Sequence, residues 1–315
     1  MMWGGGTEQI SYLRFTAQTD NSTIALNKQG SPIERVVEYA INGGSFATYI
    51  FGNTITLNTD EYVEWRRAES DESDDFSKDG NNYYYFSATG KFYHSGLFTT
   101  LLRWNTNLAT IETSAFYKLL YNVSAIIGGD GIVIPNGVVT IKSSAFSTCN
   151  SIYGILSLPN TLTDIYSGGF INCTHLTGDL IIPQNCVVGG SAAYYHSVFG
   201  SCGFNGKLVV PGVNKTIWRN TYNSCKFAEI HLEEGIEFIY QYSFSADGLT
   251  HGDIFCPPTP PVLQANNCFN PYNKRTFYIP YSADHSILTT YQTAQYWDAF
   301  VNYMIELGEN GEIPS

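Results

Sequence analysis

Short apolar runs recur along about the last two thirds of the chain. In each run an apolar residue, a variable residue and a second apolar residue follow one another, and proline usually comes next. The runs lie at 132–135, 156–159, 180–183, 208–211, 230–232, 254–257 and 277–280. A strand this short cannot bury its apolar face without a neighbour. The spacing of 22 to 28 residues therefore predicts a solenoid, in which each run pairs in parallel with the run of the next turn.

A second landmark follows these runs at a constant place in the period. It consists of an aromatic residue and, three positions later, a cysteine; the cysteines are Cys149, Cys173, Cys202 and Cys225. A glycine then precedes the next run, at Gly154, Gly178, Gly206 and Gly252. Because the cysteines keep one position of the repeat, we expect buried thiols stacked in a core and not disulfides. The seven cysteines form no CxxC pair, which argues against a zinc ribbon.

Together these landmarks resemble the unit of the bacterial surface-antigen (BspA-like) leucine-rich repeats. Such units read approximately I-x-I-P, then V-x-x-I, then A-F-x-x-C-x-x-L. The residues that fit one unit position by position are Val138, Ile141, Ala145, Phe146, Cys149 and Ile152. The resemblance covers roughly residues 106–315 and implies a leucine-rich-repeat solenoid there. It departs from the pattern at 186–198, where extra residues enter, and at 243–249, where Asp247 takes the cysteine position.

The end of the chain is similar to the aromatic segment that closes such arrays. Its aromatic residues are Tyr278, Tyr281, Tyr291, Tyr296, Trp297 and Phe300. Residues 297–305 also have the apolar spacing of a helix. We therefore expect a C-terminal capping helix that covers the last open strand edge.

The first third of the chain has a different pattern. Alternating apolar and polar residues occur at 12–16, 23–26, 36–39, 54–57 and 83–86, separated by Asn-Gly-Gly and Asp-Gly turns. This pattern predicts an antiparallel β-sandwich. The segment is also similar to the N-terminal module often joined to these repeats in proteins of gut bacteria and their phages. The expected chain is thus mostly β, with an anchoring tail at 1–9, a β-sandwich at 10–105 and a leucine-rich-repeat solenoid with its C-terminal cap at 106–315.

Charge and hydropathy exclude two classes of partner. The net charge is −12, and nine acidic residues against three basic ones fall within 60–79. An acidic chain repels nucleic-acid backbones, so no nucleic-acid partner is expected. Since no run of 18 apolar residues occurs, no membrane insertion is expected either. Residues 1–6 lack the pattern of a secretory signal.

The sequence contains none of the common motifs that bring catalytic or nucleotide-binding residues together. GxSxG, HExxH, GxGxxG and P-loop motifs are missing, and the six histidines fall at unrelated positions of the repeat. The acidic segment 69–80 contains Asp75-x-Ser77-x-Asp79-Gly80, like the first half of a calcium loop, but Phe86 stands where a glutamate ligand belongs. A solvated acidic loop is the favoured interpretation. We predict no catalytic residue, no cofactor and no metal.

The strands of the solenoid provide the candidate binding residues. The middle residue of each run points away from the core, because side chains alternate across a strand. Val133 and Ser157 begin this row, and the expected partner-binding residues are Ile181, Val209, His231, Phe255 and Tyr278, together with Trp3 of the tail. One interpretation is a face that contacts a partner. The other is that β-propensity alone favours such residues on a sheet.

These patterns favour a non-enzymatic protein of surface recognition. The first hypothesis is a phage virion component (fibre, tail or capsid-associated) that attaches through its N-terminal region and presents the solenoid to a receptor at the virion surface. The alternative is an adhesin at the bacterial cell surface. A glycan-acting enzyme comes third, because the sequence supplies no paired acids. The expected partners are a protein or surface glycan and other virion or cell-surface proteins, and homo-oligomerisation stays open.

Overall fold

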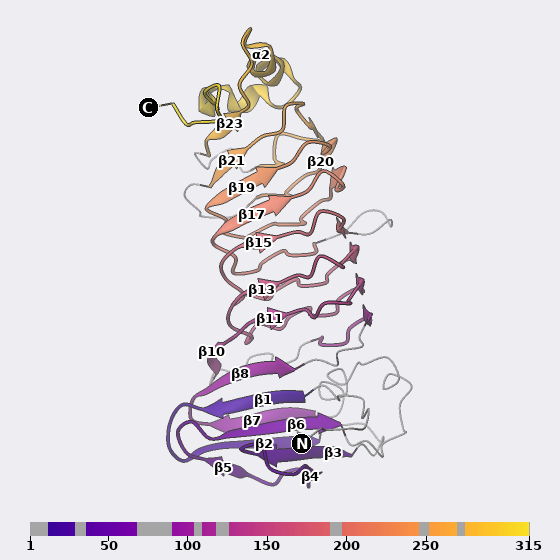
Figure 1. Ribbon diagram of the computed structural model, residues 1–315, viewed down its shortest axis with the longest axis vertical. Coiled ribbons are helices and arrows are strands. Elements are labelled where there is room, and N and C mark those ends of the chain that lie inside the picture. Colours follow the sequence, from indigo (N-terminus) through magenta and orange to yellow (C-terminus); the bar gives the residue numbers. More distant parts are fainter. Residues whose placement is uncertain are drawn as a thin grey trace, which may run out of the picture.

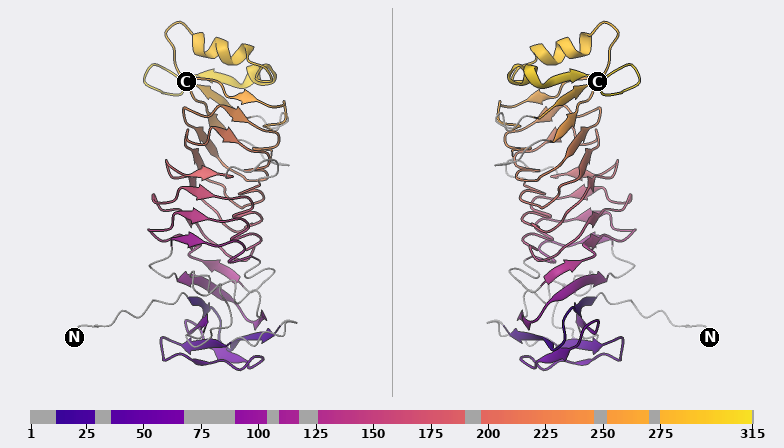
Figure 2. Two further views of the ribbon diagram at one scale, coloured as in Figure 1. Left: turned by 90° about the vertical axis from the view of Figure 1, so that its right-hand side faces the viewer. Right: turned by 90° about the vertical axis from the view of Figure 1, so that its left-hand side faces the viewer.

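The computed structural model describes residues 12–28, 36–67, 90–103, 109–117, 126–189, 197–245, 252–269 and 275–314. The molecule is elongated, with antiparallel strands at one end, a stack of solenoid turns and a short helix at the other end (Figure 1, Figure 2). A mostly β chain with a solenoid and a short C-terminal helix is therefore confirmed.

The N-terminal strands that the structure describes lie in two sheets. Their bounds are β1 (Tyr12–Ala17), β2 (Ser22–Lys28), β3 (Val37–Ile41), β4 (Ala47–Thr48), β5 (Ile55–Leu57), β6 (Tyr62–Arg67), β7 (Gly90–Ser95), β8 (Phe98–Arg103) and β10 (Ile126–Gly129). The strand order is β10-β8-β1-β6-β3-β4 in one sheet and β5-β2-β7 in the other. All pairs in these sheets are antiparallel except β10 with β8.

Buried aromatic residues join the two sheets. Trp65 of β6 is buried, and the ring of Tyr49 lies 4.6 Å from the Trp65 ring, centroid to centroid. The Tyr49 hydroxyl accepts a hydrogen bond from the backbone N–H of Leu26 in β2, at 3.0 Å. The alternating runs at 12–16, 23–26, 36–39 and 54–57 overlap strands of these sheets, which supports the predicted sandwich. The run at 83–86 and the tail at 1–9 lie outside the described residues.

Strand β10 links the N-terminal sheets to the solenoid. It comes from the segment predicted to be solenoid, yet it pairs in parallel with β8 at the edge of the N-terminal sheet. Backbone hydrogen bonds therefore continue past the boundary predicted at residue 105.

Each of the seven predicted runs contributes a strand to the main ladder of the solenoid. The strands are β11 (Ile132–Val133), β13 (Leu156–Ser157), β15 (Leu180–Ile181), β17 (Lys207–Val210), β19 (Glu229–Leu232), β21 (Asp253–Phe255) and β23 (Phe277–Ile279). Parallel pairing joins β11 to β13, and then joins β15 through β23 in order. Among the described residues no such pairing joins β13 to β15, so the ladder is interrupted there.

A second ladder of short parallel strands runs along another side of the solenoid. Its strands are β9 (Thr110–Ile111), β12 (Thr140–Ile141), β14 (Asp164–Ile165), β16 (Val187–Val188), β18 (Thr216–Ile217), β20 (Phe238–Ile239) and β22 (Val262–Leu263). It is also interrupted once in the described part of the chain, between β16 and β18.

A column of stacked aromatic rings fills the core behind the ladders. The rings of Phe146 and Phe170 are 4.8 Å apart and nearly parallel, and Phe170 and Phe199 follow at 5.4 Å. The column runs through Phe116, Phe146, Phe170, Phe199, Tyr222, Phe244 and Phe269. Each turn of the solenoid thus shares its core ring with both neighbouring turns.

The repeat cysteines form a second column beside these rings. The thiol of Cys173 donates to the carbonyl of Phe146 in the preceding turn at 3.1 Å, and Cys202 donates to Phe170 at 3.0 Å. All seven cysteines of the chain are buried thiols, which confirms the prediction made from the repeat for Cys149, Cys173, Cys202 and Cys225. Burial raises the pKa of Cys186 to about 12 and that of Cys202 well above the usual value.

These thiols should resist modification in the folded protein. A thiolate is the reactive form of cysteine, but all seven thiols are buried, and burial blocks the access of a reagent to them. With Ellman's reagent at neutral pH we expect no reaction in native buffer and reaction of all seven thiols in guanidinium chloride. Disulfides found by mass spectrometry among the repeat cysteines would contradict the column.

The C-terminal cap differs in type from the helix predicted at 297–305. Its elements are α2 (Ser286–Thr293), the 3-10 helix η2 (Asp298–Tyr303) and the strand β24 (Met304–Glu306). The predicted segment is thus a 3-10 helix followed by a strand, because β24 pairs in parallel with β23 and extends the main ladder by one strand. The predicted aromatic closure is confirmed: Tyr291, Trp297 and Phe300 are buried, and the Trp297 indole N–H donates to the Pro261 carbonyl at 2.8 Å.

Candidate recognition face

The outward residues of the main ladder form one row. We define the recognition face as this row, made of Val133, Ser157, Ile181, Val209, His231 and Phe255. Strand register places Ile181 beside Val209, Val209 beside His231 and His231 beside Phe255. Ile181 is 49% exposed, whereas the residues on either side of it, Leu180 and Ile182, are buried. The alternation expected from the sequence therefore holds, and it brings the predicted residues together.

Ring stacking orders the C-terminal half of the recognition face. The His231 and Phe255 rings are 4.3 Å apart with planes 12° from parallel, and the Tyr278 ring follows Phe255 at 4.9 Å. Rings stacked along the solenoid axis cover each other's faces and turn their edges outward. The edge of an aromatic ring carries partial positive charge, so this half suits oxygen atoms of a ligand better than a ring or sugar laid flat on it.

Tyr278 does not belong to the exposed face, contrary to the sequence prediction. Only 7% of its surface is exposed. The cause is β24, which the sequence did not predict as a strand: Ile305 pairs beside Tyr278 on one side, and Phe255 stacks on the other. The exposed row of the predicted residues therefore ends at Phe255.

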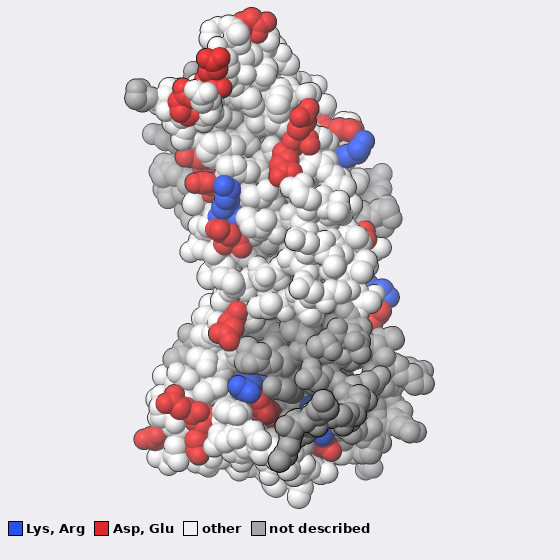
Figure 3. All heavy atoms as spheres, in the orientation of Figure 1, with Lys and Arg blue, Asp and Glu red and all other residues white. Residues whose placement is uncertain are grey.

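Charged residues flank the recognition face at the N-terminal ends of its strands. Lys207, Glu229 and Asp253 are neighbours in register along three consecutive strands. The Lys207 ammonium lies 3.7 Å from the Glu229 carboxylate, which also lies 3.0 Å from the His231 ring nitrogen Nε2. The charged side chains visible along the C-terminal half of the solenoid are mostly acidic (Figure 3).

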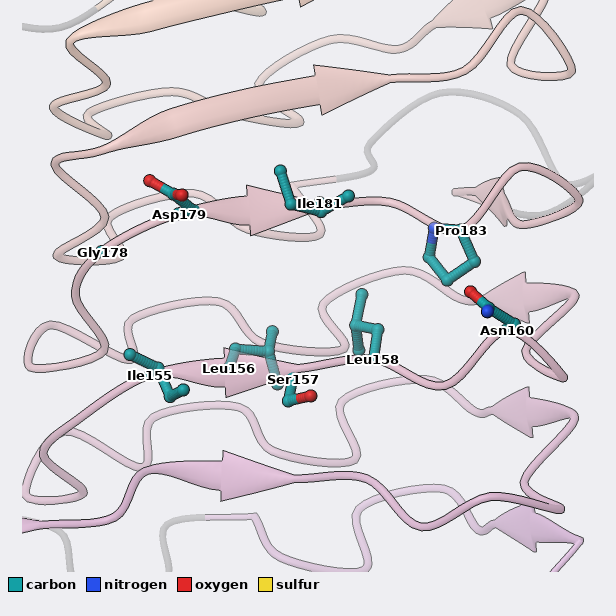
Figure 4. A pocket seen from close by; sticks show the side chains of 9 residues that line it. All are labelled: Ile155, Leu156, Ser157, Leu158, Asn160, Gly178, Asp179, Ile181 and Pro183. Atoms are coloured by element: carbon teal, nitrogen blue, oxygen red, sulfur yellow. The ribbon is translucent and has the colours of Figure 1, made fainter.

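The interruption between β13 and β15 opens a cleft of about 500 Å³ within the recognition face. Figure 4 shows that β13 and β15 stand further apart than β15 and the next strand, with the side chains of Leu158, Asn160 and Pro183 between them. The cleft is lined by Ile155, Ser157, Leu158, Asn160, Asp179 and Ile181, among others. Leu158 is half-buried, although its equivalents Ile134, Ile182 and Val210 are buried in their turns. The sequence pattern gave no sign of the cleft.

The interruption of the second ladder, between β16 and β18, is filled by a side chain. Asn214 is buried; its carboxamide accepts from the Val188 N–H at 2.7 Å and donates to the Cys186 carbonyl at 2.8 Å. An amide group of the side chain thus replaces the missing backbone partner. A sequence signal existed, because Asn214 stands where other turns have buried apolar residues, Val138, Leu162 and Ile236. As a buried residue it is also unsuited to glycosylation, although it begins an N-x-T sequence.

The remaining predicted positions give no second site. Trp3 and the acidic segment 69–80 lie outside the described residues. Glu233 accepts hydrogen bonds from the Gln184 amide at 2.9 and 3.1 Å. Within the described ranges no three His, Cys, Asp or Glu residues are grouped as metal ligands. The same ranges contain no helix long and apolar enough to cross a bilayer.

Comparison with protein families gives one match that agrees with this architecture. The model of the BspA type leucine rich repeat region matches in six copies, over residues 88–197, 129–250 and 192–285. Comparison with curated proteins gives no match. Leucine-rich-repeat solenoids typically bind other molecules through an exposed sheet and act without catalysis, and the geometry above has that form.

Proposed function

The chain belongs to the BspA-type leucine-rich repeat family, and from this premise we propose that it is a non-enzymatic recognition protein whose recognition face binds a protein or a glycan on a cell surface. The observation that carries the proposal is the row from Val133 to Phe255, in which apolar side chains stay partly exposed at the same height of successive strands. Exposed apolar rows of this kind are typical of contact surfaces.

The proposal extends to the particle that carries the protein. A rod with an antiparallel module at one end and a contact face along its length suits a phage fibre or tail. We therefore propose that the protein is part of a phage particle. A bacterial surface adhesin would use the same geometry. Electron microscopy with gold-labelled antibody against the solenoid, applied to phage particles and to cells of the native source, distinguishes the two. Label on virions supports the first, and label confined to cells supports the second.

Replacing Phe255 by serine should weaken binding to the target surface by more than about 2 kcal/mol, as truncation of an aromatic anchor commonly does. Phe238→Ser is a matched control, because Phe238 is also an outward, partly exposed phenylalanine but belongs to β20 in the second ladder. Binding of both purified variants to intact host cells would be measured after circular dichroism confirms that they are folded. Equal binding by wild type and Phe255→Ser would place recognition elsewhere on the chain.

A further inference from the structure

We propose that the recognition face binds a basic protein surface, on which apolar side chains are flanked by lysine or arginine. This inference rests on the proposed function, because it names which of two partner classes, protein or glycan, fits the recognition face. It follows from the carboxylates that border the row, from the stacking of its aromatic rings and from its exposed aliphatic side chains.

Carboxylates lie on the same side of the main ladder as the recognition face. Side chains alternate across a strand, so Glu229, within β19, and Glu233, directly after it, point to the same side as His231. The strand pairing extends to Glu233, whose N–H donates to the Val210 carbonyl of the preceding turn at 3.1 Å. Asp253 lies beside Glu229 in register. The row is therefore bordered by acidic side chains on both sides at β19.

Basic side chains do not balance these carboxylates. Lys207 lies 3.7 Å from the Glu229 carboxylate. Asp179, Asp253 and Glu233 form no ion pair with lysine or arginine within the described ranges. The visible charges along the C-terminal half of the solenoid are mostly acidic as well (Figure 3). Interfaces match opposite charges across the contact, so this border fits a partner that carries lysine or arginine.

The aromatic rings of the row do not offer the flat surface on which the C–H groups of a sugar would pack. His231 covers one face of the Phe255 ring at 4.3 Å, and Tyr278 covers the other at 4.9 Å. The ring edges that remain carry partial positive charge and suit carbonyl oxygens. An anionic glycan would in addition be repelled by Glu229 and Asp253. These features disfavour a glycan as the partner.

The aliphatic side chains of the row fit a protein partner. Val133 and Ile181 are 51% and 49% exposed, and Val209 lies beside Ile181 in register. Lysine and arginine have apolar stems that pack along such side chains while their charged ends reach water or a carboxylate. A basic protein surface can therefore contact the row and its acidic border at the same time.

Treated target cells distinguish a protein from a glycan. Fluorescently labelled full chain would be added to intact cells after trypsin has removed exposed surface proteins and has been inhibited, or after periodate has oxidised surface sugars. We expect trypsin-treated cells to bind at least about tenfold less, and periodate-treated cells to bind as untreated cells do. Added NaCl should weaken the binding, since salt screens interactions between exposed charges.

Two lysine–glutamate pairs supply matched variants. Glu229→Lys reverses a charge at the border of the recognition face, and Glu237→Lys reverses one in the pair with Lys215 on the second ladder, where the glutamate side chain is similarly exposed. We expect Glu229→Lys to slow association with target cells by about fivefold and Glu237→Lys to leave the rate nearly unchanged. Glu229→Gln should slow it by about twofold. Circular dichroism would confirm that all three variants are folded.

Binding that survives trypsin and is lost after periodate would overturn the inference, and so would equal association rates of Glu229→Lys and Glu237→Lys. If Phe255→Ser also abolished such periodate-sensitive binding, the proposed function would stand with a glycan as the partner. Binding that is unchanged in Phe255→Ser would instead remove the proposed function together with this inference.

Discussion

Replacing Phe170 by alanine is expected to lower the free energy of unfolding by about 3 to 5 kcal/mol. Phe170 is buried and stacks between Phe146 and Phe199, so its removal leaves a cavity that borders two other turns. Turns of a solenoid are held mainly by their nearest neighbours, so one missing ring weakens the interfaces on both sides.

Chemical denaturation followed by tryptophan fluorescence and circular dichroism measures this loss. Phe238→Ala is the control, since this side chain is partly exposed on β20, and we expect a change nearer to about 0.5 kcal/mol. A Phe170→Ala protein as stable as the control would mean that the aromatic column does not hold the turns together.

Replacing Asn214 by alanine should lower the free energy of unfolding by about 2 to 4 kcal/mol, because it leaves the Val188 N–H and the Cys186 C=O buried without partners. Hydrogen exchange at the Val188 amide should become faster in the variant, which a loss of packing elsewhere would not cause.

Asn214→Val is the informative companion variant. Valine stands at the equivalent position of an intact turn, Val138, and would restore apolar packing without the hydrogen bonds. We expect it to be less stable than the wild type. A more stable Asn214→Val protein would contradict the assignment of the carboxamide as the substitute for backbone pairing.

The solenoid was predictable because its signal is local and repeated. The alternation within 180–183 and 208–211 placed Ile181 and Val209 on one face, and the cysteine of each repeat predicted a column of thiols. Tyr278 was misassigned because its exposure depends on β24, a strand whose apolar spacing is equally compatible with a helix.

The cleft was not predictable from the sequence, for a different reason. The runs that contain Leu156 and Ile181 have the same sequence pattern as the runs whose strands pair. The distance between two turns depends on packing along the whole solenoid, and a short sequence motif does not predict it. Asn214 did carry a signal, a polar residue at an apolar position of the repeat. The role of Asn214 follows only from the structure, in which its carboxamide lies at the interruption between β16 and β18.

Site-specific photo-crosslinking tests the central claim, recognition through the exposed face of the main ladder, most directly. A benzophenone amino acid would replace Ile181 in one variant and Val262 in another; these residues are 49% and 51% exposed, and Val262 belongs to the second ladder. Irradiation on intact target cells should attach the Ile181 variant to a surface component and leave the Val262 variant free. Crosslinking from Val262 and not from Ile181 would contradict the account.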